Sequence, residues 1–154
     1  ASIEIRHLTN IIRIDEGIAT LFGGSGGCSL DWHLSKLKLF IEQQPEYPLN
    51  DLSKLQIDIP NGEHKTDFRY AIGGLLMQKI YKREGMPGLF EALRSGNAET
   101  DYFNFLEKKL GVTKDNFEAY IKQEIKKDDL TICASTANLI PNIHPRIKST
   151  PAKP

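Results

Sequence analysis

The sequence predicts a mostly α-helical protein, with about six to seven helices packed as an irregular bundle. Apolar residues recur every three to four positions over most of residues 12–127, whereas the two-residue alternation that is typical of strands is rare. The chain has 154 residues, of which 40% are hydrophobic, and this is enough to build one hydrophobic core. We therefore expect a single helical domain over residues 1–128.

A glycine-rich turn separates the first two predicted helices. The first helix covers roughly residues 12–22 and ends at residues 23–27, where four glycines and a serine form a flexible turn. Ser29 is expected to be the N-cap of the second helix, whose apolar residues keep helical spacing until Pro45 stops it.

The next part of the chain, residues 45–65, is predicted to be an ordered connection. It contains three prolines and a glycine, which break regular structure. Within it we expect a short helical turn at residues 52–55 and an extended stretch at residues 56–59.

The longest predicted helix covers about residues 66–83 and closes at Gly85, with Pro87 beyond it. Three shorter helices follow, of which Asn97 can cap the second and Thr113 the third. Their apolar residues recur at helical spacing: Leu89, Phe90 and Leu93, then Tyr102, Phe103, Leu106 and Leu110, then Phe117, Tyr120, Ile121 and Ile125. Residues 129–154 are rich in proline towards their end and are predicted to be a tail or linker.

Charge and hydropathy exclude two classes of partner. The 20 basic residues balance 20 acidic ones, so the chain lacks the positive charge that non-specific nucleic-acid binding needs. No uncharged apolar stretch approaches the roughly 18 residues that a membrane-spanning helix requires. We expect no nucleic-acid partner and no membrane span.

The first candidate functional residue is Glu16. In a helix it shares a face with Ala19, Thr20 and Gly23, and such small residues let another backbone come close. Glu16 could then be a positioned ligand. The alternative is that Asp15 and Glu16 simply complement the dipole at the start of the helix.

The second candidate is Tyr70. It lies one turn before Gly73 and Gly74, and two adjacent glycines inside a helix cost roughly 1 kcal/mol each relative to alanine. Close approach of a chain segment or a ligand would explain them, and Tyr70 could donate a hydrogen bond into that space. The alternative is helix-against-helix packing with Tyr70 at its rim.

Together these motifs resemble the gluzincin metallopeptidases, which include the M1 aminopeptidases and the broader peptidase MA-like domains. Residues 15–20 (DEGIAT) resemble the helix that carries the third zinc ligand there, and residues 70–73 (YAIG), which begin 54 positions after Glu16, resemble the helix of the oxyanion-stabilising tyrosine. The sequence GMPGLFEAL at residues 85–93 and the helices that follow are similar to the C-terminal helical subdomain of those families. The resemblance covers roughly residues 11–126. It implies that Glu16 is the third zinc ligand, that Tyr70 is catalytic, and that the substrate is a peptide or protein.

The chain departs from these families in one essential motif. A gluzincin binds zinc through the two histidines of His-Glu-x-x-His. Here the histidines are His7, His33, His64 and His144, and no two are four positions apart. The zinc helix is expected upstream in the parent protein, or else the parent is a degenerate relative. In both cases this chain alone is expected neither to bind zinc nor to hydrolyse peptides.

Two other hypotheses stay open. One is a non-catalytic helical interaction module, whose Glu16 and Tyr70 faces bind a partner helix or form a homodimer. The other is a thiol enzyme at Cys28, because a thiolate is stabilised at a helix N-terminus. His33 is expected to be a surface or rim residue, and Cys28 and Cys133 are too few to predict a disulfide framework.

Overall fold

The computed structural model describes residues 14–49, 55–60, 64–96, 98–127 and 143–145. The first helix is α2 (Ile14–Gly23) and the second is α3 (Leu30–Gln43). The long central helix is α4 (Phe68–Arg94), followed by α5 (Glu99–Leu110) and α6 (Phe117–Lys127). The prediction of a mostly α-helical bundle is confirmed, although the described residues form five helices, fewer than expected.

The helix count differs because two predicted helices form one. The segment expected to end at Gly85 continues as α4, with a kink at this residue, where φ is 67° and ψ is −154°. Glycine adopts positive φ at no steric cost, and Pro87 fits the first turn of the segment beyond the kink. The predicted break is therefore present, but the two segments belong to a single bent helix.

Local signals explain most of the other boundaries. The predicted N-cap, Ser29, accepts a hydrogen bond from the backbone N–H of Trp32. Thr113 caps a turn that precedes α6, since its hydroxyl accepts from the backbone N–H of Asn116. Asn97, expected to cap α5, lies outside the described residues.

A small antiparallel sheet flanks one end of the bundle. It has the order β2–β1–β3, with β1 (Leu55–Asp58) in the centre, β2 (Lys65–Thr66) on one side and β3 (Ile143–Pro145) on the other. In register, Ile57 pairs with both Thr66 and Ile143. The extended stretch predicted at residues 56–59 is confirmed, whereas the helical turn predicted to include Leu55 is wrong at that residue. Residues 143–145, expected to belong to a tail or linker, contribute an edge strand.

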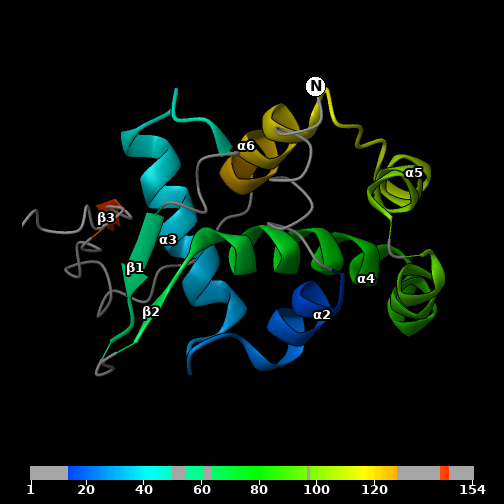
Figure 1. Cartoon of the computed structure of the whole chain (residues 1–154), viewed down its shortest axis with the longest axis horizontal. Coiled ribbons are helices and arrows are strands. Elements are labelled where there is room, and N and C mark those ends of the chain that lie inside the picture. The colour runs from blue at the N-terminus through cyan, green and yellow to red at the C-terminus, as the bar shows by residue number, and fades with distance from the viewer. Residues whose placement is uncertain (1–13, 50–54, 61–63, 97, 128–142, 146–154) are drawn as a thin grey trace, which may run out of the picture.

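The core is built around α4. Figure 1 shows α4 crossing the middle of the molecule, with α2 on one side, α6 on the other and α5 beside its far end, and α3 also contacts it. The residues of its first half are buried on nearly all sides, which is typical of a central helix. They are Phe68, Ala71, Ile72, Gly73, Gly74, Leu75, Leu76, Met77 and Ile80. No helix in the described ranges is both long enough and apolar enough to cross a membrane.

Candidate functional site

The two glycine motifs meet where α2 crosses α4. A Cβ atom added to Gly17 would lie 2.6 Å from the backbone oxygen of Gly73 and 2.9 Å from Cγ of Met77, so only glycine fits at this position. A Cβ on Gly74 would clash with Cδ1 of Leu30 in α3 and would lie 3.3 Å from the Thr20 methyl carbon of α2. The close approach of both α2 and α3 to this part of α4 agrees with the helix-packing alternative for Tyr70.

Only part of the small-residue face of α2 takes part in this contact. Thr20 is buried against α4, whereas Ala19 and Gly23 stay exposed. Glu16, one residue before the crossing, is half-buried, and its backbone oxygen accepts a hydrogen bond from the Thr20 hydroxyl at 2.8 Å. A face that was expected to be free for docking is thus partly used within the domain.

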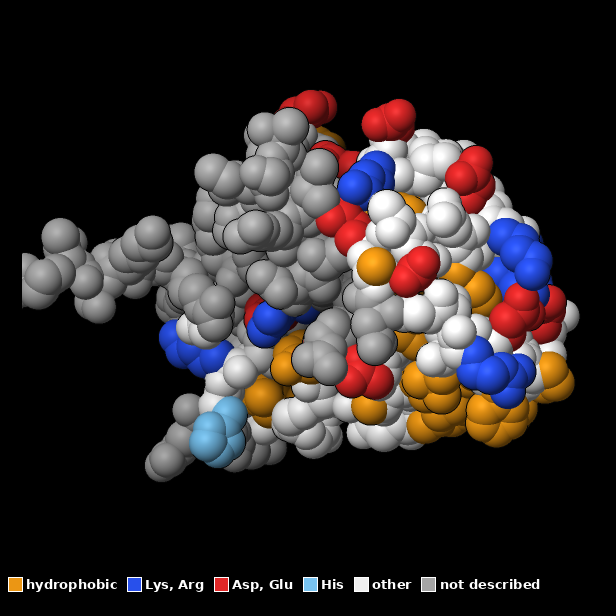
Figure 2. Space-filling view, turned by 45° about the vertical axis from the view of Figure 1, so that its right-hand side comes forward, with side chains coloured by type: hydrophobic (Ala, Val, Ile, Leu, Met, Phe, Trp, Pro, Cys, Tyr) orange, Lys and Arg blue, Asp and Glu red, His pale blue; other side chains and the backbone are white. Residues whose placement is uncertain are grey.

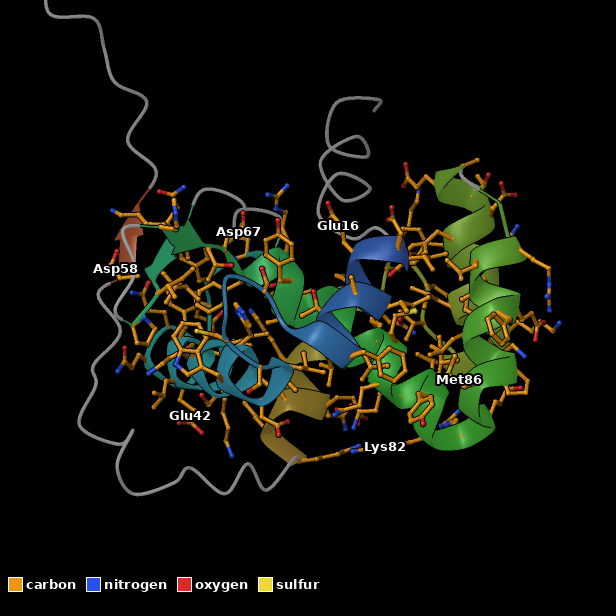
Figure 3. The ribbon with its side chains drawn as sticks, turned by 90° about the horizontal axis from the view of Figure 1, so that it is seen from below. Glu16, Glu42, Asp58, Asp67, Lys82 and Met86 are labelled. Atoms are coloured by element: carbon orange, nitrogen blue, oxygen red, sulfur yellow. The ribbon has the colours of Figure 1, made fainter. Side chains whose placement is uncertain are left out.

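Glu16 and Tyr70 both lie on the N-terminal side of the crossing, because they precede Gly17 and Gly73 in their helices, and both affect the pKa of Arg69. The Arg69 guanidinium carbon lies 5.8 Å from the centre of the Tyr70 ring. The pKa of Arg69 is raised, chiefly by hydrogen bonds to Asp67 and further by the charges of Asp67, Tyr70 and Glu16. Figure 3 shows Glu16 and Asp67 on the same side of the molecule.

Asp67 fixes the Arg69 side chain. Asp67 is only 4% exposed and is the N-cap of α4, where its Oδ1 accepts the backbone N–H of Arg69 at 3.0 Å. Both oxygens of the same carboxylate accept a hydrogen bond from Nε of Arg69, at 2.9 and 3.0 Å, and Oδ2 forms an ion pair with Nη2 at 2.9 Å. This fork geometry is the strongest form of an arginine–carboxylate pair, so it holds the cation in one place.

Sequence reasoning missed Asp67 and Arg69. The available signal was the Asp67-Phe68 step, since aspartate followed by a periodic apolar run is typical of an N-cap. The predicted helix start near residue 66 was one to two residues early, so Asp67 was not recognised as the cap.

The described residues do not form a complete zinc site. A catalytic zinc needs three protein ligands, but no group of three histidine, cysteine, aspartate or glutamate side chains is close enough to hold a metal within the described ranges. Glu16 can offer one carboxylate. His7 lies outside the described residues.

His33 is a core residue, which corrects its expected place at the surface or rim. Its side chain is 0% exposed, and Nε2 lies 2.9 Å from the backbone oxygen of Ser25, tying α3 to the glycine turn. Burial lowers the pKa of His33, although Ser25 and the charge of Asp67 act against this shift. A neutral imidazole therefore stabilises the turn. His64 is exposed, and the side chain of His144 is not described.

Cys28 lacks an activated thiolate. It closes the glycine turn through two backbone hydrogen bonds with Ser25, of 2.9 and 3.0 Å, so the turn is ordered. Burial raises the pKa of the Cys28 thiol, and the charge of Lys36 only partly offsets this. The hypothesis of a thiol enzyme at Cys28 gains no support from this environment. Cys133 lies outside the described residues.

Comparison with family models, with curated proteins and with solved structures finds no match for this chain.

Proposed function

We propose that this chain is the C-terminal helical part of a gluzincin-like zinc metallopeptidase domain that hydrolyses peptides or proteins. The observation that supports this proposal is the close crossing of α2 and α4 at Gly17 and Gly73, which leaves Glu16 and Tyr70 at one end of the crossing beside a fixed guanidinium. Separate, unrelated surface positions for the two side chains would have argued against a shared site.

In this proposal each side chain has a distinct task. The Glu16 carboxylate is the third ligand of a zinc ion whose two histidine ligands come from outside the described residues. The zinc supplies Lewis-acid chemistry and activates water when it is bound. The Tyr70 hydroxyl donates a hydrogen bond to the oxyanion that develops in the transition state. Gly73 keeps the tyrosine helix close to the glutamate helix.

The alternative is a non-catalytic helical interaction module or a degenerate peptidase relative. It is favoured by the incomplete ligand set, because one carboxylate cannot hold catalytic zinc among the described residues. Both hypotheses use the same fold, so metal content separates them.

The test is zinc content by elemental analysis, on this chain and on a longer product of its gene that begins about fifty residues further upstream. We expect stoichiometric zinc in the longer form and none in this chain alone. Glu16→Ala should remove the zinc of the longer form, whereas Glu42→Ala, at an exposed carboxylate of α3 (Figure 3), should leave it. Unchanged zinc in Glu16→Ala would rule out the assignment of this ligand, and zinc in neither form would favour the interaction module.

The tyrosine is tested on the zinc-loaded longer form. Tyr70→Phe should lower kcat for peptide hydrolysis by roughly 10²- to 10³-fold with little change in KM, because the hydrogen bond forms in the transition state. Tyr81→Phe removes a hydroxyl from the exposed side of the same helix and should not change kcat. An equal loss of folding stability and activity in Tyr70→Phe would identify a structural residue instead.

A further inference from the structure

The large apolar side chains that the described residues leave exposed all lie on one part of the surface. Phe22 ends α2 and is 58% exposed, and the other four lie on the far half of α4. The Phe22 and Tyr81 rings touch edge to face, with centroids 5.6 Å apart. Beyond the kink, Met86, Phe90 and Leu93 follow each other at four and three residues, which aligns them along one side of the helix. We call these five residues the apolar face, and Figure 2 shows orange side chains gathered at the lower edge of this region.

This clustering is not expected of an ordinary surface. Single exposed apolar side chains are normal, but a contiguous patch marks a contact site for a protein, a membrane or a ligand. Phe90 and Leu93 are 48% and 52% exposed, whereas their neighbours Leu89 and Ala92 in the same segment are buried. Packing within the domain therefore needs only one side of this segment.

Positive charge borders the apolar face. The far half of α4 carries three cations, Lys82, Arg83 and Arg94, and two carboxylates, Glu84 and Glu91, an excess of one positive charge. The carboxylates of Glu84 and Glu91 pair with lysines of α5, at 2.8 Å for Glu84–Lys109 and 2.9 Å for Glu91–Lys108. No carboxylate of the described residues pairs with the three cations of this half of α4, although Arg83 donates a hydrogen bond to the backbone oxygen of Lys109 at 2.7 Å.

We propose that the apolar face docks on an anionic lipid surface as a peripheral contact. Apolar and aromatic side chains that enter the headgroup boundary, with basic side chains beside them, are the chemistry by which a helix lies on an anionic membrane. The three cations on the far half of α4 that pair with no carboxylate of the described residues supply the complementarity to lipid phosphates and carboxylates. The proposal does not depend on the peptidase hypothesis.

The shape and the charge favour this occupant over two others. A helical peptide partner needs a groove, whereas Met86, Phe90 and Leu93 project from the outer side of a helix whose inner side is buried. A second copy in a symmetric dimer would place the apolar face against itself and bring its three unpaired cations towards their counterparts, which repel one another.

The test is vesicle co-sedimentation of the chain. Vesicles of phosphatidylcholine with about one third phosphatidylserine are compared with pure phosphatidylcholine vesicles. We expect binding to the anionic vesicles only, and weaker binding at about 1 M salt, where the Debye length falls to roughly 3 Å. Phe90→Ser should reduce the partition coefficient at least about tenfold, because it removes an inserted ring. Arg94→Gln should reduce it roughly fivefold.

Matched controls lie on other helices. Asn104→Ser changes an exposed side chain of α5 away from this face, and Lys126→Gln removes an exposed cation of α6, so both should bind as the parent does. Circular dichroism checks that each variant is folded. Absence of binding by the parent chain, or equal binding to neutral vesicles, would overturn the proposal. A dimer in light scattering that Phe90→Ser converts to a monomer would overturn it as well and assign the face to a second copy.

Discussion

The two halves of α4 belong to one helix and yet have opposite surroundings. From Phe68 to Ile80 the helix packs against α2 and α3 and is joined to α6 by the Lys79–Glu124 ion pair, and most of its residues are buried. From Tyr81 to Arg94 it contacts α5, and the Tyr81 ring touches Phe22 of α2, but a row of apolar side chains stays exposed. The kink at Gly85 lies close to the point where the helix passes from buried to partly exposed surroundings. The comparison shows that apolar residues at helical spacing identify a helix, but the neighbours decide whether its apolar side becomes core or surface.

The largest expected difference between the halves concerns packing. Leu76→Ala removes a fully buried side chain and should lower the free energy of unfolding by about 3 kcal/mol, because it creates a cavity. Leu93→Ala, at an exposed leucine of the far half, should change it by about 0.5 kcal/mol or less. Urea unfolding followed by circular dichroism measures both. Equal losses would mean that the far half is covered and that the comparison is wrong.

A somewhat smaller effect is expected at the helix crossing. Gly17→Ala should lower the free energy of unfolding by about 2 kcal/mol, because the new methyl group meets the rigid backbone of Gly73. Gly23→Ala is the matched control in the same helix, where a Cβ meets nothing within 4 Å, and alanine should be neutral or stabilising there. Thermal unfolding compares the two variants. A tolerated Gly17→Ala would show that α2 and α4 are not in close contact.

The smallest effect is expected from the ion pairs that join the far half of α4 to α5. Hydrogen bonds from Lys109 and Lys108 lower the pKa of Glu91 to about 2. A depressed carboxyl pKa stabilises the folded state above the unfolded value near 4.5, and this contribution is lost as pH falls towards 2. As the pH is lowered, the midpoint of unfolding should therefore fall slightly less steeply for Glu91→Gln than for the parent chain. Identical pH dependence would show that the pair contributes nothing measurable, as is common for exposed pairs.

The sequence predicted the local elements well wherever one residue decides the geometry. The Ser29 cap and the break at Gly85 are set by nearby chemistry, namely a hydroxyl acceptor and a positive φ angle. The extended stretch that overlaps β1 was predicted between prolines and a glycine that break regular structure. The reason for Gly73 and Gly74 was also anticipated as close approach of another segment. The roles of Glu16 and Tyr70 in zinc chemistry stay predictions.

Other features could not be predicted because they depend on residues distant in the chain. His33 was placed at the surface or rim, yet it is buried because α3 packs against the glycine turn that carries Ser25. The Arg69 side chain is held by its hydrogen bonds to Asp67. Its pKa is also raised by the charge of Glu16, which lies in α2, more than fifty positions earlier in the chain. Neither spacing nor propensity reports such contacts.

The sequence by itself determined the helical class, several helix ends and the close approach of a chain segment or a ligand at Gly73 and Gly74. These follow from periodicity, caps and backbone freedom, which act over a few residues. Only the tertiary structure decided which segment fills the space beside Gly73, that Glu16 and Tyr70 share one end of the crossing, and that the far half of α4 keeps an apolar face exposed. The physical reason is that burial is a property of the assembled neighbours, and a chain cannot specify it one helix at a time.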